Sequence, residues 1–204
     1  MNFDATRRAL HGIAELVLAG PQFDRSGTIR LRITPGGFGT VAEPDLRVEG
    51  DHLVANGLRL PLKGTSADLA LAAGLQVRPL NDVYRDGSGV TPDEVVDVDP
   101  DAAVVIADAF AQGDRAMREF APDQTPVLWP EHFDLGIALD EVNYGISPGD
   151  KHFTEPYAYV GPWKQRAGAF WNTAFGAAYP LSRLDSIVTF FQEGRAEAAK
   201  SDLL

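Results

Sequence analysis

The sequence contains no cysteine, and that absence excludes several kinds of site. Without thiols the chain has no disulfide framework, no cysteine nucleophile and no thiolate ligand for zinc or an iron–sulfur cluster. The fold must therefore rest on an apolar core. The chain has 204 residues, of which 45% are hydrophobic, and this is enough to bury such a core.

Positive charge is also scarce. Lys and Arg number 18 against 29 Asp and Glu, which gives a formal net charge of −11 at pH 7. A surface this acidic repels phosphate backbones, and no basic cluster offsets the charge locally. We therefore expect no nucleic-acid partner, and the same repulsion disfavours an anionic membrane.

Long apolar runs are missing too. A transmembrane helix needs about 20 consecutive apolar residues, whereas the longest candidate run, residues 102–107, ends at Asp108. The first residues also lack the apolar segment and cleavage site of a secretory signal. We expect a cytoplasmic protein without a membrane partner, and its preference for Arg over Lys is typical of GC-rich bacterial genomes.

The first 80 residues predict a helix followed by an antiparallel β-meander. Leu10, Ile13 and Val17 recur at helical spacing, and Gly20-Pro21 is expected to end the helix. Polar residues are available for its solvent-facing side, namely Arg7, Arg8 and Glu15. Strands are then expected at 28–34, 46–48, 52–55 and 58–60, with a short helix at 66–73.

Residues 81–97 are rich in turn-forming and acidic residues and mark the expected boundary between two halves. Beyond them, Asp99 is the predicted N-cap of a long helix that begins at Pro100. Further strands are expected at 126–129, 132–140, 157–161 and 169–175, and a final helix at 182–200.

These elements predict the α+β class, because strands come in runs rather than in strand–helix–strand alternation. We expect an antiparallel β-meander and C-terminal antiparallel strands packed with about four helices. The chain, 1–204, is expected to form a single domain with two sub-structures, 1–80 and 98–204.

Aromatic side chains that carry a polar group gather between residues 129 and 179. This segment holds all three tryptophans and four of the five tyrosines. Such side chains commonly line ligand pockets. They also favour the cores of β-sheets, so the sequence leaves both interpretations open.

The strand expected at 132–140 places His132 and Asp134 on one face, followed by small residues. Tyr157 and Tyr159 likewise share one face of the strand expected at 157–161. If these two strands pair, the tyrosines lie beside the His/Asp pair. Residues 143–155 are expected to form a long loop around a Ser-Pro-Gly-Asp turn, and long loops often carry function.

The leading hypothesis is a binding protein for a small organic ligand in an aromatic-lined pocket. Its motivation is the clustering of amphipathic aromatic residues around the face that carries the His/Asp pair. The loop 147–155 is expected at the mouth of the pocket. The predicted ligand-binding residues are Trp129, His132, Asp134, Tyr157, Tyr159 and Trp163.

The second hypothesis is a metal-dependent enzyme. Two imidazoles and one carboxylate form the facial set of ligands that suits iron, manganese or zinc. The predicted metal ligands are His132, Asp134 and His152, with Glu155 or Asp150 as the fourth. The competing interpretation is that a His-x-Asp pair in a strand is an ordinary surface pair.

Other catalytic patterns are missing from the sequence. There is no Gly-x-Ser-x-Gly nucleophile turn. The glycine-rich stretch 35–40 lacks the Lys-Ser/Thr ending of a phosphate-binding loop and is expected to form a bend between strands. His11 and His52 are expected on a helix surface and in a hairpin. The sequence therefore assigns no catalytic residue and no cofactor.

The third hypothesis is a structural or interaction protein that forms a homodimer. The C-terminal helix is amphipathic, and its apolar stripe has two candidate places, a protein core or a partner subunit. In the dimer hypothesis, Ile187, Phe190 and Phe191 face the partner.

Four strings of the sequence carry a resemblance to other proteins. They are Gly-Gly-Phe-Gly-Thr at 36–40, Leu-Trp-Pro-Glu-His-Phe-Asp at 128–134, Asn-Tyr-Gly with Ser-Pro-Gly-Asp at 143–150, and Glu-Pro-Tyr with Tyr-Val-Gly-Pro-Trp at 155–163. With these strings the chain resembles a group of uncharacterised actinobacterial proteins of this length. The resemblance spans most of the chain from the meander onward, and it implies no activity and no residue role.

Overall fold

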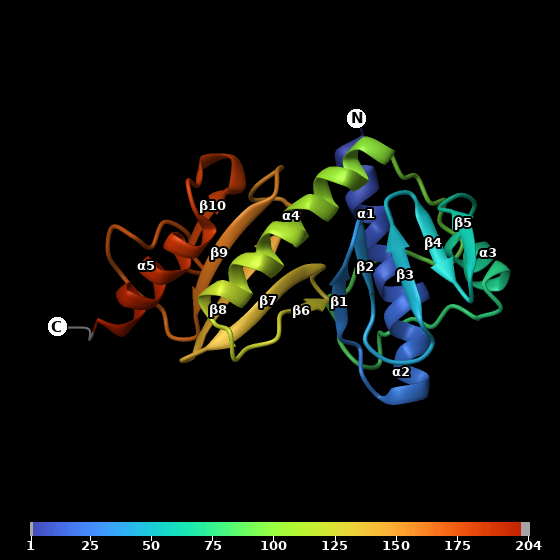
Figure 1. Ribbon diagram of the computed structural model, residues 1–204, viewed down its shortest axis with the longest axis horizontal. Helices are drawn as coiled ribbons and strands as arrows, with labels where there is room; N and C mark the ends of the chain where they lie inside the picture. Colours follow the sequence, from blue (N-terminus) through green and yellow to red (C-terminus); the bar gives the residue numbers. More distant parts are fainter. Residues whose placement is uncertain (1, 201–204) are drawn as a thin grey trace. The chain divides into compact units, whose positions relative to one another are not determined.

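The computed structural model describes residues 2–200, which form two compact units (Figure 1). Unit 1 comprises the chain up to Ala111 together with Val127–Phe133, and unit 2 comprises Gln112–Pro126 and the chain from Asp134 onward. Each unit combines helices with antiparallel strands, which confirms the α+β class. Within residues 2–200, no helix is both long enough and apolar enough to span a membrane.

Unit 1 is a helix packed on an antiparallel sheet with the strand order β5-β4-β3-β2-β1-β6. The predicted meander is confirmed. Its elements are α1 Phe3–Ile13, the π-helix η1 Ala14–Ala19, α2 Gly20–Ser26, β1 Leu31–Thr34, β2 Gly37–Thr40, β3 Leu46–Glu49, β4 His52–Ala55, β5 Leu58–Pro61, α3 Ser66–Ala72, the first part of α4 Pro100–Phe120, and β6 Val127–Trp129. The stretch 35–40 is not only a bend, because its second part forms the strand β2.

The sequence predicted that the N-terminal helix ends at Gly20-Pro21, but the helical backbone continues beyond these residues. One turn of π-helix precedes these residues, and Pro21 then lies in the first turn of α2. Proline is tolerated in a first turn because the backbone N–H it lacks has no helical partner there. Gly20 serves packing instead, since a side chain at this position would overlap the carbonyl of Arg78. The helix ends at Gly27.

The core of unit 1 lies between this helix and the sheet. Phe133 occupies its centre and is 1% exposed. Its ring stacks on His11 at 5.4 Å between centroids and meets Phe38 and Phe110 edge-on at 5.4 and 5.3 Å. The sequence predicted His11 on the helix surface, but its ring is half-buried. His52 lies in the β4–β5 hairpin, as predicted.

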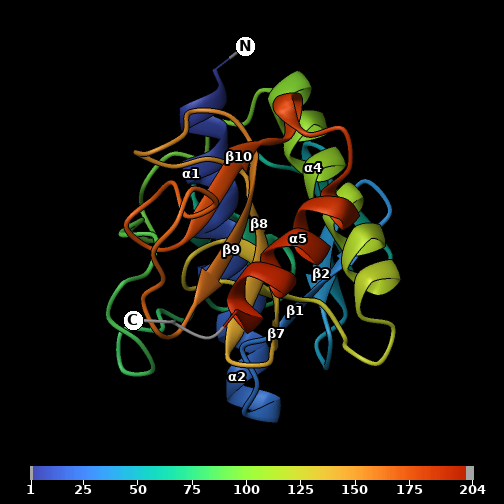
Figure 2. The same ribbon diagram turned by 90° about the vertical axis from the view of Figure 1, so that its left-hand side faces the viewer.

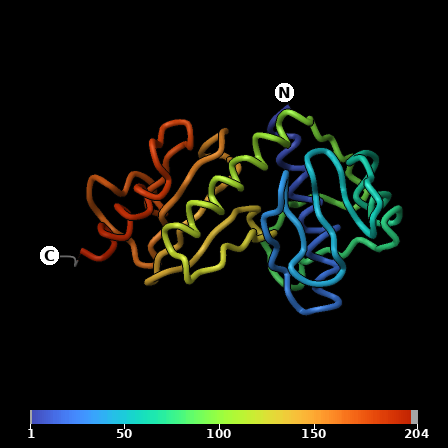
Figure 3. The backbone as a smooth tube through the Cα atoms, in the orientation of Figure 1, coloured from blue at the N-terminus to red at the C-terminus, as the bar shows by residue number. Residues whose placement is uncertain are grey.

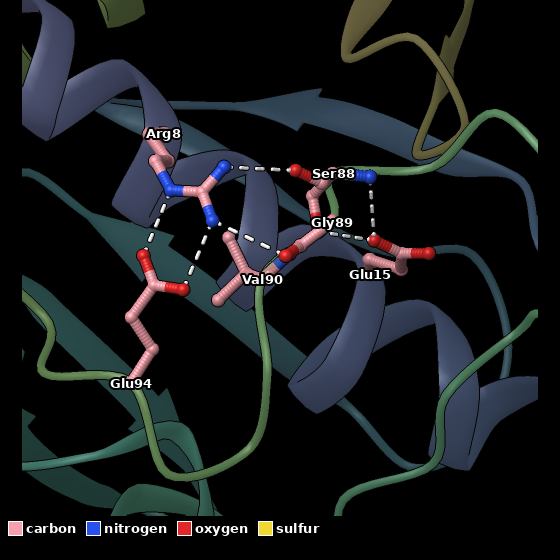
Figure 4. A network of polar contacts seen from close by, with 6 residues as sticks. All are labelled: Arg8, Glu15, Ser88, Gly89, Val90 and Glu94. Atoms are coloured by element: carbon pink, nitrogen blue, oxygen red, sulfur yellow. Dashed lines mark hydrogen bonds and ion pairs between the residues drawn. The ribbon is translucent and has the colours of Figure 1, made fainter.

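Residues 81–97 belong to unit 1, where two side chains of the N-terminal helix hold them (Figure 4). Arg8 pairs with both carboxylate oxygens of Glu94 at 2.8 and 2.9 Å and also donates to the carbonyls of Ser88 and Gly89. The carboxylate of Glu15 accepts from the backbone N–H and the hydroxyl of Ser88 at 2.9 and 2.5 Å. Glu15 is 3% exposed, so its predicted place on the solvent-facing side is wrong.

Unit 2 is a four-stranded antiparallel sheet in the order β7-β8-β9-β10, covered by helices on one face. Figure 3 traces its backbone through successive hairpins. Its elements are the second part of α4, β7 Asp134–Leu139, β8 Val142–Ser147, β9 Tyr157–Pro162, β10 Ala177–Pro180, the short 3-10 helix η2 Leu181–Arg183, and α5 Ile187–Ala199.

Three predictions for unit 2 need correction. Residues 142–147 form the strand β8, where a loop was expected, and 169–175 form no strand. The strand expected from His132 begins at Asp134, because Phe133 has a φ of +53° and breaks the extended backbone. His132 and Asp134 consequently do not share a strand face.

The covered face of the unit 2 sheet packs against α5, which lies across β8 and β9 (Figure 2). Tyr144 and Phe191 meet edge-on at 5.6 Å, and Gly194 lies directly against Val160. Phe190 and Phe191 are 4% and 0% exposed. Phe190 and Phe191 therefore face the core of unit 2 and not a partner subunit, whereas Ile187 is half-buried. The homodimer itself stays a prediction.

Candidate functional site

The face of the unit 2 sheet that points away from α5 carries the polar residues, and several of them, among them Ser147 and Tyr157, are buried. Alternation along each strand turns them away from Tyr144 and Val160, which lie against α5. This face, called the polar face below, carries Asp134, Gly136, Asn143, Gly145, Ser147, Tyr157, Tyr159 and Gly161, together with Ala138, Ala178 and Pro180. Four of the residues predicted to form a site, Asp134, Tyr157, Tyr159 and the neighbouring Trp163, thus come from one unit.

Tyr159 reaches across one strand, β8, to Asp134. The sequence suggested that their strands pair directly, but β8 lies between them, with Gly136, Gly145 and Tyr159 in one row. The phenol ring lies over Gly145, where any side chain would overlap it. The Tyr159 hydroxyl then donates a hydrogen bond to the Asp134 carboxylate. Gly145 in the middle strand therefore leaves the space that lets Tyr159 reach Asp134.

The Tyr159 phenol is protonated at neutral pH. Burial raises the pKa of Tyr159 well above its usual value, and the negative charge of Asp134 raises it further. The hydroxyl consequently keeps its proton and remains a hydrogen-bond donor.

Tyr157 and Asp150 attach the loop 148–156 to this face. The Tyr157 hydroxyl donates to Asp150 Oδ2 at 2.8 Å, while Asp150 Oδ1 accepts from the backbone N–H groups of His152 and Phe153 at 2.6 and 3.1 Å. Burial alone would raise the pKa of the Asp150 carboxyl, but these donors outweigh it and the pKa lies below its usual value. Asp150 is therefore an ionised anchor for the loop.

The loop leads on to a second aromatic group of unit 2. The His152 ring meets Phe175 edge-on at 6.0 Å. Phe175 lies in a tight turn from Thr173 to Gly176 that two backbone hydrogen bonds close. Gly176 has a φ of +142°, and a side chain there would overlap the carbonyl of Val160. The turn thus requires glycine where it rejoins the sheet.

A hollow of about 260 Å³ opens beside this turn, at the end of β9. Its walls include Pro162, Trp163, Gln165, Arg166, Thr173 and Phe175. Trp163 is 63% exposed and Phe175 is 38% exposed, which is unusual for such large apolar side chains.

The exposed indole of Trp163 is held in place by its polar edge. Its Nε1–H donates to Asn143 Oδ1 on the neighbouring strand at 3.1 Å. Its backbone N–H donates to the carbonyl of Glu141 at 2.9 Å. Because the only polar atom of the indole is used by the protein, the flat apolar faces of the ring remain for other contacts.

Trp129 and His132, the two other residues of the predicted pocket, belong to unit 1. There Arg30 lies over the Trp129 ring at 5.8 Å. The His132 imidazole is 60% exposed, and its Nε2 is 3.9 Å from the Glu131 carboxylate.

The predicted metal ligands do not gather into a site. Across residues 2–200, no three His, Asp or Glu side chains lie in an arrangement able to hold a metal ion. The residues make separate contacts, with Asp134 bound to Tyr159, His152 packed on Phe175 and Glu155 accepting from Ser182 at 2.7 Å. The geometry gives the metal hypothesis no support.

Three residues of the candidate site were not predicted from the sequence. Asn143 orients Trp163, and Phe175 and Arg166 line the hollow. The available signal was the alternation of residues 142–147, in which Val142, Tyr144 and Ile146 face the core. That pattern predicts a strand with Asn143 on the opposite face, but Gly145 and the turn residues that follow led to the prediction of a loop.

Comparison of the chain with protein-family models, with curated proteins and with solved structures gives no match.

Proposed function

We propose that unit 2 binds a small organic ligand in the hollow beside Trp163. The observation that carries this proposal is the exposed indole, which Asn143 fixes at the edge of a hollow of about 260 Å³. Ligand sites in proteins typically combine aromatic surfaces with a small number of well-placed polar groups. Gln165 and Arg166 supply such groups around the indole.

The energetics of the free protein agree with a binding role. Trp163 leaves most of its side chain in water, so it contributes little to folding. The hydrogen bond to Asn143 nevertheless restricts the ring to one orientation. A ring that is ordered before the ligand arrives loses little conformational entropy on binding, and this favours affinity.

The polar contacts on the polar face of the unit 2 sheet have a supporting role in this proposal. Tyr159, Asp134, Tyr157 and Asp150 bond to one another or to the loop 148–156. His152 of that loop then packs on Phe175, which forms one wall of the hollow. The predicted site residues therefore act mainly as a frame for the loop and for Phe175, and the ligand itself contacts Trp163.

Native mass spectrometry of the full chain tests this proposal. We expect the wild-type protein, incubated with a mixture of neutral sugars, aromatic carboxylates and amino acids, to retain at least one compound. The variant Trp163→Ala is expected to lose it while keeping the same circular dichroism spectrum. The matched control is Val104→Ala, which removes part of a side chain that is 53% exposed in another unit. Equal retention by wild type and Trp163→Ala contradicts the proposal.

A further inference from the structure

The shape and lining of the Trp163 hollow restrict the chemistry of its ligand. Trp163 offers a flat apolar surface that is fixed in orientation, and Phe175 adds a second, smaller one. A ligand that covers the indole must therefore have a flat or gently puckered apolar face. Aliphatic chains, which are cylindrical and flexible, match such a surface poorly.

The polar groups around the hollow donate and accept hydrogen bonds. Gln165 carries an amide, Thr173 a hydroxyl and Arg166 a guanidinium. The Thr173 hydroxyl has no hydrogen-bond partner among residues 2–200, but it is buried, so Thr173 lines the hollow without offering its hydroxyl to a ligand. Because the Gln165 amide donates and accepts and the Arg166 guanidinium donates, the rim of the ligand is expected to carry hydroxyl-type groups, which do both.

The charges near the hollow do not select a strongly charged ligand. Lys164, next to Trp163 in the chain, pairs with Glu141 at 3.4 Å. Arg166 lines the hollow, but the chain as a whole carries a net charge of −11. A dedicated anion site needs converging cationic or N–H groups, and a cation site needs carboxylates. The residues that line this hollow form neither set.

We infer that the ligand of the Trp163 hollow is a neutral pyranose sugar, an inference that rests on the proposed binding function. A pyranose ring has a face of C–H groups and a rim of hydroxyls. The C–H hydrogens carry partial positive charge and are attracted to the electron-rich face of the indole. The rim hydroxyls then meet Gln165 and Arg166. One sugar ring also matches a hollow of about 260 Å³.

Saturation-transfer difference NMR on the full chain tests the ligand class. The probes are the methyl glycosides of glucose, galactose and mannose together with N-acetylglucosamine. Benzoate and indole-3-acetate represent aromatic anions, and glucosamine represents a cationic sugar. We expect transfer to the ring C–H protons of at least one neutral pyranoside. Trp163→Ala is expected to weaken that binding roughly tenfold, whereas Trp163→Phe, which keeps an aromatic face, weakens it less.

The outcomes separate the inference from the proposal beneath it. If the neutral pyranosides give no transfer, or the same transfer in Trp163→Ala as in wild type, the sugar inference is overturned. If the aromatic anions then give a Trp163-dependent signal, the binding function stands and only the ligand class is wrong. If no probe of any class depends on Trp163, and native mass spectrometry also finds no retained compound, both fail.

Discussion

The two units share an architecture, but their polar side chains hold different parts of the chain in place. In each, an antiparallel sheet buries one face against helices. In unit 1, the buried carboxylate of Glu15 and the guanidinium of Arg8 are both used to hold the chain segment around Ser88. In unit 2, the polar contacts hold a loop and an indole that is 63% exposed. The difference indicates that the polar groups of unit 1 are structural, whereas those of unit 2 support an open surface.

The largest effect is expected from removing the core that supports this open surface. Phe191→Ala deletes a fully buried ring that contacts both Tyr144 and Phe120. We expect a loss of about 3–5 kcal/mol in the free energy of unfolding, because the cavity removes packing as well as burial. Urea denaturation followed by circular dichroism measures it. A loss no larger than that of the exposed-site control Val104→Ala, about 0.5 kcal/mol or less, contradicts the assigned core.

The next effect concerns the buried carboxylate of unit 1. Glu15→Ala removes the acceptor of two hydrogen bonds from Ser88 and leaves these donors without it. We expect a loss of roughly 1.5–3 kcal/mol, the usual range for hydrogen bonds to charged groups. The comparison variant is Glu94→Gln, whose partner Arg8 is about half exposed, and about 1 kcal/mol or less is expected there. Equal losses of unfolding free energy in Glu15→Ala and Glu94→Gln would contradict the view that the buried Glu15 contact stabilises unit 1 more than the exposed Glu94 contact.

A moderate, pH-dependent effect is expected at Tyr159. Tyr159→Phe keeps the ring over Gly145 but loses the hydrogen bond to Asp134, which we expect to cost about 1.5 kcal/mol at pH 7. Because the pKa of Tyr159 is raised in the folded state, the unfolded chain releases this proton first. The stability of the wild-type protein therefore falls as pH rises above about 10, the pKa of an unperturbed tyrosine.

Denaturation at pH 7 and at pH 10.5 checks the Tyr159 prediction. The wild-type protein is expected to lose more stability between these two pH values than Tyr159→Phe does. Other buried tyrosines with raised pKa values, among them Tyr144, contribute to the loss in both proteins and so cancel in the difference. The same loss in both would mean that the Tyr159 phenol does not titrate differently on folding.

The smallest effect on stability is expected at Asn143. Asn143→Ala removes the acceptor that holds the Trp163 indole, yet Asn143 and Trp163 are both exposed. The free energy of unfolding should change by about 0.5 kcal/mol or less. Ligand binding should weaken several-fold, because a mobile indole must be ordered on binding. Asn143→Asp, which keeps an acceptor oxygen, should restore most of the affinity, and a failure to do so argues against an orienting role.

The sequence predicted the helices and strands correctly where residues close together in the chain determine a turn or a helix end. The meander is marked by Gly50-Asp51 and Asn56-Gly57, which lie between β3, β4 and β5. The long helix starts after Asp99, whose carboxylate accepts from the N–H groups of Asp101 and Ala102. In these places the turn or cap chemistry is contained within a few residues.

The remaining features depend on contacts between distant residues. Glu15 is buried because Ser88, 73 positions away, supplies its donors, and no pattern within the helix signals this. Gly145 suggested a loop, but its role is to leave space for the Tyr159 ring. The sequence suggested that Tyr159 lies near Asp134, and the two are hydrogen-bonded, but it overlooked β8 between their strands, and Tyr157 bonds to Asp150. The hollow beside Trp163 needs Phe175, which the sequence assigned to a strand.

The most direct test of the account is a titration of the three indole N–H signals in a ¹⁵N–¹H correlation spectrum, since the chain has three tryptophans. The Trp163 signal is assigned by its loss in Trp163→Phe, and Trp129 is the internal reference in unit 1. On addition of the pyranosides and aromatic carboxylates, we expect at least one compound to shift the Trp163 indole N–H signal and to leave the Trp129 signal unchanged. If no compound moves the Trp163 signal, or if both signals move alike, the proposed binding site is wrong.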